Sequence, residues 1–285
     1  MNKKFLQVAT DVAKEASEIL KGDFYEPRPT PLIDEKGVHL QTDFEIEQLI
    51  KGRIGNEFPD HSFQGEEEGN NGKESDYKWI VDPIDGTSNY FCHNPFFCVS
   101  IALTYQNELV LGVIDAPIIN EGFIISKNES LRIYSCIEST TPKRPEGLSA
   151  PPNLGGEFEE RIINPEIVSF DKIVIGGRSY QSRCENIENY SIKNDKTYTK
   201  IEMGAAALEL AYVASGKIQG YMVEGIKDWD VAAGVLMVRE MGGKVLNWKG
   251  EDWSFGDTQL VAGREDIVEG LLEKVSNLNS GTSSA

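Results

Sequence analysis

The sequence predicts a mixed fold in two parts, an α+β first half and an α/β second half. Two observations predict it: short β-type runs follow one another between residues 79 and 126, and strand-like and helix-like runs alternate after residue 171. A stretch rich in Pro, Gly, Ser and Glu, residues 137–169, lies between these parts. We therefore expect an α+β domain over residues 1–140, a linker or surface excursion over 141–170, and an α/β domain over 171–285.

Two helices are predicted before the first strand. Apolar residues recur at three- and four-residue steps from Phe5 to Leu20 and stop at Gly22, as in an amphipathic helix with a glycine C-cap. A second helix is predicted from about Asp43 to near Pro59. Its expected apolar face consists of Phe44, Ile46, Leu49, Ile50 and Ile54. The stretch between the helices, residues 25–42, is predicted to be irregular because it holds three prolines and a glycine.

The strands of the first half are predicted at residues 79–81, 97–104, 108–115 and 121–126. The strands of the second half are predicted at 172–175, 197–201, 219–223, 244–246 and 259–262. Helices are predicted within 180–190 and over 204–214, 231–241 and 265–275. Alternation of this kind is typical of an α/β unit.

Composition excludes several classes of function. With 28 basic and 46 acidic side chains the formal net charge is −18, so nucleic acid and anionic membranes are not expected partners. The longest apolar runs, such as residues 109–114, fall far short of the ~20 residues of a membrane-spanning helix. Four cysteines without a CxxC pair suit a reducing compartment, and we expect a cytoplasmic protein.

The most informative motif is the run from Trp79 to Thr87, in which a strand is expected to carry Asp82 and Asp85 into a turn. Two carboxylates held close together repel each other unless a cation or a proton lies between them. Hard oxygen ligands favour Mg²⁺. An ordinary Asp-Gly turn is an equally good interpretation of this motif alone.

Two further acidic stretches change that balance. Glu66, Glu67 and Glu68 follow the second predicted helix, and Asp228 and Asp230 open a later one. Each alone is more often a solvated turn or a helix cap. Their combination with the first motif is more informative than any one of them.

Together these stretches resemble the inositol monophosphatase family of Mg²⁺-dependent, lithium-sensitive phosphomonoesterases. The matching stretches are Gly65 to Glu67, Trp79 to Tyr90, Pro95, Val99 to Ala102, Trp229 to Gly234, and Glu240 to Gly243. The resemblance covers roughly residues 5–275 in outline. It implies a layered αβαβα sandwich, a homodimer, a small phosphate ester as substrate, and two or three Mg²⁺ ions.

The resemblance also implies a metal ligand set. Glu66, Asp82 and the carbonyl of Ile84 would hold the first Mg²⁺. Asp82, Asp85 and Asp230 would hold the second. Metal pairs in such enzymes supply hydroxide from water and stabilise the leaving oxygen of the ester.

Further roles follow from the same resemblance. The amides of Gly86 and Thr87 would bind phosphate at a helix start. Glu67 and Thr87 would orient the attacking water. Asp230 would take part in catalysis and, with Asp85, contact the substrate.

Two alternatives compete with this interpretation: a phosphatase that forms an aspartyl-phosphate, and a protein without catalytic activity. Haloacid-dehalogenase phosphatases carry two aspartates two residues apart, whereas Asp82 and Asp85 are three apart, which disfavours an aspartyl-phosphate route. A non-catalytic regulator that binds a metal or a sugar phosphate is the other alternative. It would have no need of the water-orienting pair Glu67 and Thr87.

The substrate is harder to predict. Members that cleave 3′-phosphoadenosine phosphates usually carry Lys-Glu after the motif threonine, whereas this chain has Ser88-Asn89, which favours a sugar or polyol phosphate. Fructose 1,6-bisphosphate, histidinol phosphate, NADP and 3′-phosphoadenosine phosphate remain alternatives. The carboxylate that reads substrate hydroxyls in inositol enzymes corresponds to Val223, so Glu224 can contact substrate only if the strand end is bulged.

Overall fold

The computed structural model describes residues 3–26, 32–34, 37–137, 157–163, 173–176 and 198–279 of the 285 residues. The helices within these ranges are α1 (Lys3–Asp23), α2 (Gln41–Glu57), α3 (Thr87–Phe91), α5 (Ala206–Ala214), α6 (Asp228–Glu240) and α7 (Glu265–Asn279). All the helices predicted within these ranges are present. The helix predicted within 180–190 and most of the expected excursion lie outside the described residues.

The larger sheet has seven strands in the order β3-β4-β5-β6-β7-β8-β9. They are β3 (Ser62–Gly65), β4 (Tyr77–Asp85), β5 (Cys98–Tyr105), β6 (Glu108–Ala116), β7 (Glu121–Ser126), β8 (Leu131–Ile137) and β9 (Glu157–Ile163). Strand β3 runs parallel to β4, and every other neighbouring pair is antiparallel.

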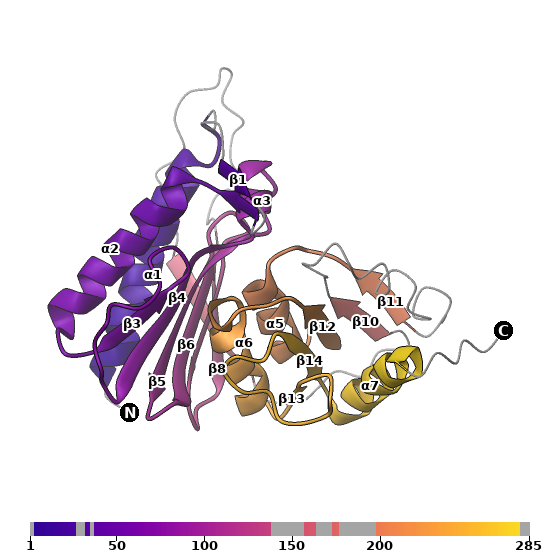
Figure 1. Cartoon of the computed structure of the whole chain (residues 1–285). Coiled ribbons are helices and arrows are strands. Elements are labelled where there is room, and N and C mark those ends of the chain that lie inside the picture. The colour runs from indigo at the N-terminus through magenta and orange to yellow at the C-terminus, as the bar shows by residue number, and fades with distance from the viewer. Residues whose placement is uncertain are drawn as a thin grey trace, which may run out of the picture.

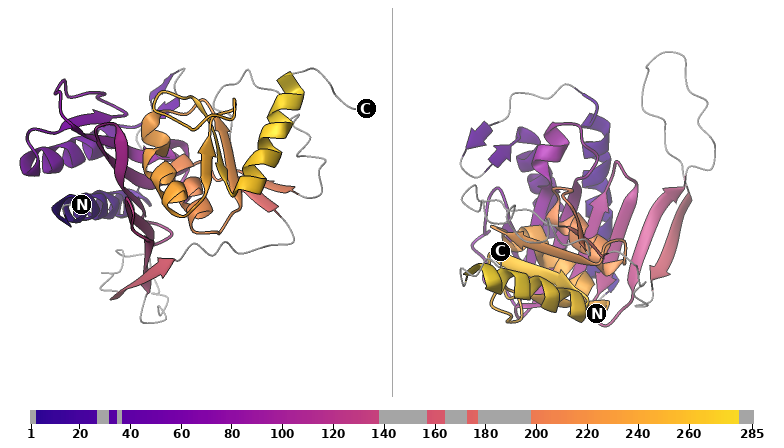
Figure 2. Two further views of the ribbon diagram at one scale, coloured as in Figure 1. Left: turned by 90° about the horizontal axis from the view of Figure 1, so that it is seen from below. Right: turned by 90° about the vertical axis from the view of Figure 1, so that its right-hand side faces the viewer.

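Three of these strands, β3, β8 and β9, were not predicted from the sequence. Strand β9 lies within the excursion expected at residues 137–169 and pairs with β8 along its whole length. Its sequence, EFEERII, places three glutamates among the apolar residues, which hides the strand pattern. The right view of Figure 2 shows β8 and β9 at the edge of the larger sheet.

The smaller sheet has five strands in the order β11-β10-β12-β14-β13. They are β10 (Ile173–Gly176), β11 (Tyr198–Ile201), β12 (Gly220–Glu224), β13 (Lys244–Leu246) and β14 (Gln259–Gly263). Strand β10 is parallel to β11 and β12, whereas β14 is antiparallel to β12 and β13. The interval predicted to be irregular holds a small hairpin of β1 (Leu32–Asp34) and β2 (Gly37–His39).

The elements stack in five layers, which confirms the αβαβα sandwich. In Figure 1, α1 and α2 cover the outer face of the larger sheet, α5 and α6 lie between the sheets, and α7 covers the outer face of the smaller sheet. Three clusters of buried apolar side chains fill the spaces between the layers. One joins α1 and α2 to the larger sheet, the largest surrounds α5 and α6, and the third lies beneath α7.

Helices α5 and α6 tie the two predicted domains into one core. Buried residues of both sheets pack in the cluster that surrounds these helices. The left view of Figure 2 shows the same order of layers, from α1 and α2 to α7. The division at residues 141–170 stays a prediction. Among the described helices, none is both long enough and apolar enough to cross a bilayer.

Candidate active site

A bulge in β4 brings two carboxylates to the same face of the larger sheet. Asp82 lies opposite Ser100 of β5, and Asp85 lies opposite Cys98, with a shift of register between them. Because Ser100 and Cys98 are two residues apart, their side chains share a face, and so do those of their partners. In a regular strand, a spacing of three would place the two aspartates on opposite faces. The strand predicted over residues 79–81 is therefore too short: β4 continues through Asp85, with Pro83 inside the bulge, and the expected tight bend comes at Gly86.

Both aspartates are buried and bonded to backbone N–H groups. Asp82 is 2% exposed, and its Oδ1 accepts the N–H of Ile84 at 3.0 Å. Asp85 is 4% exposed and accepts the N–H groups of Ala206 and Ala207 at 3.0 and 2.7 Å. These two amides belong to the start of α5, where helical N–H groups have no partner within the helix. The second half of the chain thus holds an acid of the first half in place.

Glu66 and Asp230 complete a cluster of acids around Asp82. Glu66 follows β3 directly, and Asp230 lies in the first turn of α6, where the N–H of Lys227 donates to its Oδ2 at 2.7 Å. Burial, followed by the charges of Glu66 and Asp85, raises the pKa of Asp82 well above its usual value. Burial and then the charge of Asp230 do the same to the pKa of Glu66.

The pKa values of two further members of the cluster lie near neutrality. Burial raises the pKa of Asp85 to about 7, against the lowering effect of its hydrogen bonds with the α5 amides. Burial also raises the pKa of Asp230 to about 7, and the charge of Asp85 adds to this. Four predicted metal-ligand side chains, Glu66, Asp82, Asp85 and Asp230, therefore lie close enough to perturb one another.

Helix α2 supplies a fifth acid that the sequence did not reveal. Asp43 is 1% exposed, and its Oδ1 accepts the Thr87 hydroxyl at 3.1 Å. Burial, together with the nearby charge of Glu67, raises the pKa of Asp43 to about 7. An acid near a helix N-terminus is common for local reasons, so its position in the sequence did not distinguish it.

The apolar face predicted for α2 is wrong in part. Phe44 is 42% exposed, whereas Asp43 and Glu47, four residues apart, are buried together with Ile46, Ile50 and Ile54. Each Glu47 oxygen accepts one backbone N–H, from Glu67 and Glu68, both at 2.8 Å. The signal that the sequence offered was the spacing alone: two acids four residues apart lie on the same side of a helix.

Glu47 also explains the glycine at the end of β3. A Cβ atom on Gly65 would lie 2.3 Å from the carboxyl carbon of Glu47. The loop of Glu66, Glu67 and Glu68 therefore turns directly over the Glu47 carboxylate. Glu47 fixes the backbone of the loop that carries the predicted metal ligand and the predicted water-orienting residue.

The residues after β4 form a tight start to α3. Gly86 has φ of 93°, and an added Cβ would lie 3.1 Å from the carbonyl oxygen of Phe96, so glycine suits this position. The Thr87 hydroxyl lies 3.0 Å from the carbonyl oxygen of Ile84, as well as near Asp43. That carbonyl is the one the resemblance assigned to a metal, and a carbonyl oxygen has two lone pairs to share.

The structure separates Glu224 from this group. Strand β12 pairs with β14 without a register shift, from Gly220 to Glu224, so the bulge that would bring Glu224 to the substrate is absent. Val223 is fully buried on the side of α5 and α6. Since side chains alternate, Glu224 lies on the opposite face, where Gln259 Nε2 donates to it at 2.9 Å.

The cluster has the chemistry of a divalent cation site, although its side chains do not form a closed cage. Among the residues described, no three acidic, histidine or cysteine side chains already form a metal-binding group. Each acid instead bonds to nearby backbone amides or to a neighbour. Three buried carboxylates, of Asp43, Asp82 and Asp85, and the half-buried ones of Glu66 and Asp230 nevertheless fit a hard cation with oxygen ligands, since their charges raise one another's pKa values.

Known proteins share this architecture. A model of the inositol monophosphatase family matches residues 1–280. The protein named Nus factor SuhB from Pasteurella multocida is 32% identical over 279 residues, and inositol-1-monophosphatase from Mesorhizobium japonicum is 30% identical over 280; each match covers 95% of both chains. The crystal structure of extragenic suppressor protein suhB from Bartonella henselae superposes with a TM-score of 0.77 at 27% identity, covering 95% of this chain and 98% of the other.

Proposed function

Because this chain belongs to the inositol monophosphatase family, we propose that it is a Mg²⁺-dependent phosphomonoesterase acting on a sugar or polyol phosphate. Family membership supports a phosphatase of this superfamily, and the metal and the substrate class are our proposal. One observation carries it. The bulge in β4 turns Asp82 and Asp85 to the same face of the sheet, beside Glu66 and Asp230.

The proposed metal ligands are Glu66, Asp82, Asp85 and Asp230, together with the carbonyl of Ile84. When bound, magnesium supplies Lewis acidity and compensates the charge of the phosphate. Asp82 lies centrally among the four acids, since the charges of Glu66, Asp85 and Asp230 all act on its pKa. The α5 amides and the Lys227 amide hold Asp85 and Asp230 in place before any ligand binds.

Thr87 and Asp43 form the proposed unit that orients the attacking water. The Thr87 hydroxyl donates toward Asp43 Oδ1 and the Ile84 carbonyl, which leaves its oxygen able to accept a hydrogen bond from the attacking water. A carboxyl whose pKa lies at about 7, as for Asp43, suits proton transfer near neutral pH. Glu67, on the loop held by Glu47, is the second proposed orienting residue.

We propose that the amides of Gly86 and Thr87 bind the phosphate at the start of α3. Asp85 and Asp230 are the proposed contacts to the substrate from the metal cluster. A contact from Glu224 stays a prediction, and its position beside Gln259 argues for a smaller role. With Val223 buried, the chain lacks the usual acid at that position, which favours broad specificity among polyol phosphates.

A panel of phosphate esters tests the proposal. The panel contains inositol 1-phosphate, fructose 1,6-bisphosphate, histidinol phosphate, NADP and 3′-phosphoadenosine phosphate, each assayed for phosphate release with Mg²⁺ and with chelator. We expect release from several sugar and polyol phosphates, loss of it in chelator, and inhibition by lithium. The relative from Pasteurella is named a Nus factor, so a non-catalytic role is the competing proposal. That role predicts no release from any ester.

A cytoplasmic location and a homodimer also stay predictions. The first rests on cysteine usage and the second on the family resemblance. Sedimentation equilibrium of the purified protein tests the second directly.

A further inference from the structure

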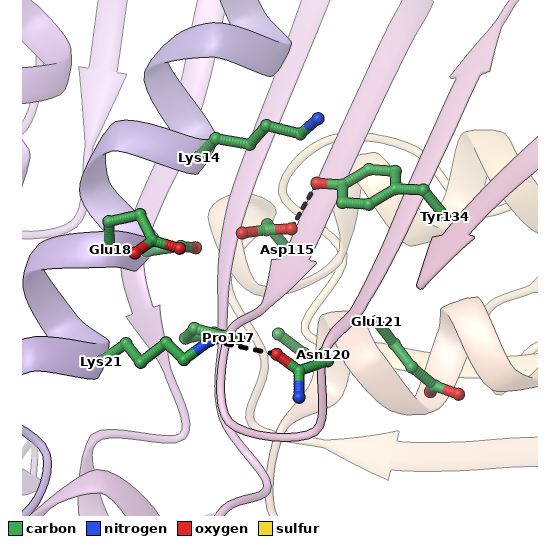
Figure 3. A pocket seen from close by; sticks show the side chains of 10 residues that line it. Lys14, Glu18, Lys21, Asp115, Pro117, Asn120, Glu121 and Tyr134 are labelled. Atoms are coloured by element: carbon green, nitrogen blue, oxygen red, sulfur yellow. Dashed lines mark hydrogen bonds between the residues drawn. The ribbon is translucent and has the colours of Figure 1, made fainter. Parts of the chain in front are cut away.

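A cavity lined mostly by residues with polar side chains lies between α1 and the ends of strands β6, β7 and β8. Its volume is about 340 Å³, at the small end of the range for small-molecule sites. Figure 3 shows Lys14 and Glu18 extending from α1 toward Asp115 and Tyr134, and Lys21 meeting Asn120 of the turn after β6. These six side chains define what we call the α1 cavity.

The α1 cavity lies on the opposite face of the larger sheet from the predicted metal ligands. Asp115 pairs with Val99, whose side chain packs in the cluster beneath α1 and α2. The residue of β5 that precedes Val99, Cys98, faces α5 and α6 and lies opposite Asp85. Since neighbouring residues of a strand alternate between faces, the cavity and the Asp85 site are separate.

The floor of the α1 cavity is a buried carboxylate with a fixed aromatic partner. Asp115 is 7% exposed and accepts the Tyr134 hydroxyl. The Tyr134 ring crosses Gly122 of the neighbouring strand, where an added Cβ would lie 1.9 Å from a ring carbon. Any side chain at position 122 would displace the ring, so Gly122 permits the contact between Tyr134 and Asp115.

The walls present donors beside acceptors. Lys14 Nζ lies 4.4 Å from the centre of the Tyr134 ring, near Asp115. At the other end, Lys21 Nζ donates to Asn120 Oδ1 at 3.1 Å. Asn120 has φ of 54°, an uncommon conformation for a residue other than glycine, and this turns the end of the β6–β7 loop toward α1.

The formal charges of the α1 cavity balance. Two lysines face two carboxylates, Asp115 and Glu18. A third carboxylate on the rim, Glu121, forms an ion pair with Lys217 and accepts the Tyr212 hydroxyl at 2.9 Å. A balanced lining gives no net attraction to an anion or a cation. Alternating donors and acceptors match hydroxyl groups, each of which donates one hydrogen bond and accepts others.

We propose that the α1 cavity binds a small neutral polyol, such as a cyclitol or a monosaccharide. Vicinal hydroxyls would donate to Asp115 and Glu18 and accept from Lys14, Lys21 and the Asn120 amide. The site lies outside the phosphatase centre, and the proposal does not depend on the activity proposed above.

Nuclear magnetic resonance of the whole chain tests the proposal, with myo-inositol as the probe. The solution contains chelator and inorganic phosphate. Neither a bound metal nor a vacant phosphate site can then contribute to the chemical-shift changes that myo-inositol causes. We expect saturable shifts of the backbone amides of Ala116, Asn120 and Glu121. Titrations with serine, a zwitterion, and with phosphate alone are the comparison ligands and should leave these amides unchanged.

Paired variants on α1 provide the controls. Glu18→Gln and Lys21→Gln should each weaken myo-inositol binding about tenfold, the loss typical of one hydrogen bond to a charged group. Glu15→Gln and Lys3→Gln, on the same helix outside the cavity, should not change it. Absence of a saturable shift in the parent protein overturns the proposal. Equal effects of both pairs, or tighter binding of serine or phosphate, overturn it as well.

Discussion

Two regions that contain buried carboxylates, the acids around Asp82 and the surroundings of Asp115, lie at the same end of the larger sheet but differ in what accompanies the charge. Asp85 of β4 and Asp115 of β6 lie opposite the adjacent residues Cys98 and Val99 of the strand between them. The first, which we call the Asp82 group, contains five acids that raise one another's pKa values, namely Asp43, Glu66, Asp82, Asp85 and Asp230. Burial raises the pKa of Asp115 above its usual value, although the side chains of Ser17 and Tyr134 and the charge of Lys14 lower it in part.

The difference shows which buried acids need an external partner. A buried carboxylate is tolerated when hydrogen bonds and an opposite charge accompany it, as at Asp115. Among the acids around Asp82, backbone N–H groups bind one oxygen of Asp82 and both oxygens of Asp85, but the charges of neighbouring acids remain uncompensated. We interpret the Asp82 group as incomplete without a cation and the Asp115 group as complete.

The largest expected effect separates the two groups directly. Asp82→Asn should lower phosphate release by more than about 100-fold, because residues that only support metal ligands already contribute 10–100-fold. In chelator the same variant should be more stable than the parent, since it removes a repelling charge. Thermal unfolding and phosphate release check both effects.

Asp115→Asn is the matched control. It should leave phosphate release close to the parent value and destabilise the fold by about 1–3 kcal/mol, because the new amide oxygen accepts the Tyr134 hydroxyl without the strength that the carboxylate charge gives. If Asp82→Asn destabilises the chelated protein as Asp115→Asn does, the contrast between the groups is wrong.

The second prediction concerns the water-orienting unit. Thr87→Val and Asp43→Asn should each lower kcat by about 100-fold with little change in KM, as expected when a transition-state interaction is lost. The double variant should be hardly slower than either single one, because the two residues act together. Steady-state kinetics on inositol 1-phosphate measure this.

Glu67→Gln provides the comparison for that unit. If Glu67 orients the water, its variant also loses kcat while binding Mg²⁺ and substrate. A rise in KM at unchanged kcat would identify Glu67 as a binding residue instead.

The third prediction addresses the support of the Glu66 loop. Glu47→Gln retains the shape of the side chain. It has only one acceptor oxygen and no charge, so it cannot bind the N–H groups of both Glu67 and Glu68 as strongly as the carboxylate does. We expect Mg²⁺ affinity to fall 10–100-fold, the range for residues that orient metal ligands. Calorimetric titration checks this, and Glu45→Gln, on the exposed side of α2, should have no effect.

The fourth prediction is the pH dependence of the metal-free fold. The pKa values of Asp43, Asp85 and Asp230 are raised from 3.8 to about 7. Between those values the folded chain binds more protons than the unfolded chain, so the free energy of unfolding falls as pH rises. The midpoint in chelator should drop by about 5 °C or more from pH 4 to pH 7. An unfolding midpoint that rises across this window contradicts the account.

The smallest effect is expected at Glu224. Because its carboxylate pairs with Gln259 on the face away from α6, Glu224→Ala should change kcat/KM for inositol 1-phosphate by less than about threefold. Gln259→Ala, which removes only the partner, should behave in the same way. A loss of kcat/KM near the 10⁴-fold expected when a buried hydrogen bond to a substrate hydroxyl is removed would instead identify Glu224 as the residue that binds that hydroxyl.

Apolar periodicity predicted most of the helices and strands, and the family resemblance implied how they stack in layers. The periodicity did not predict β9, where adjacent charged residues break the alternation typical of a strand, and it placed the exposed Phe44 on the apolar face of α2. Of the candidate site, the motif acids were apparent from type and spacing. The bulge that aligns Asp82 with Asp85 depends on pairing with β5, which is a tertiary property. Asp43 and Glu47 were missed because their hydrogen-bond partners lie 20 or more residues away, at the start of α3 and in the loop after β3.

The most direct test of the account is a calorimetric titration of Mg²⁺ into metal-free parent, Asp82→Asn and Asp115→Asn proteins. The account predicts saturable binding in the parent and in Asp115→Asn, release of protons on binding near pH 7, and loss of binding in Asp82→Asn. Proton release follows because carboxyls with a pKa of about 7 must ionise to bind a cation. Binding that Asp82→Asn leaves unchanged, or that Asp115→Asn abolishes in a folded protein, would contradict it.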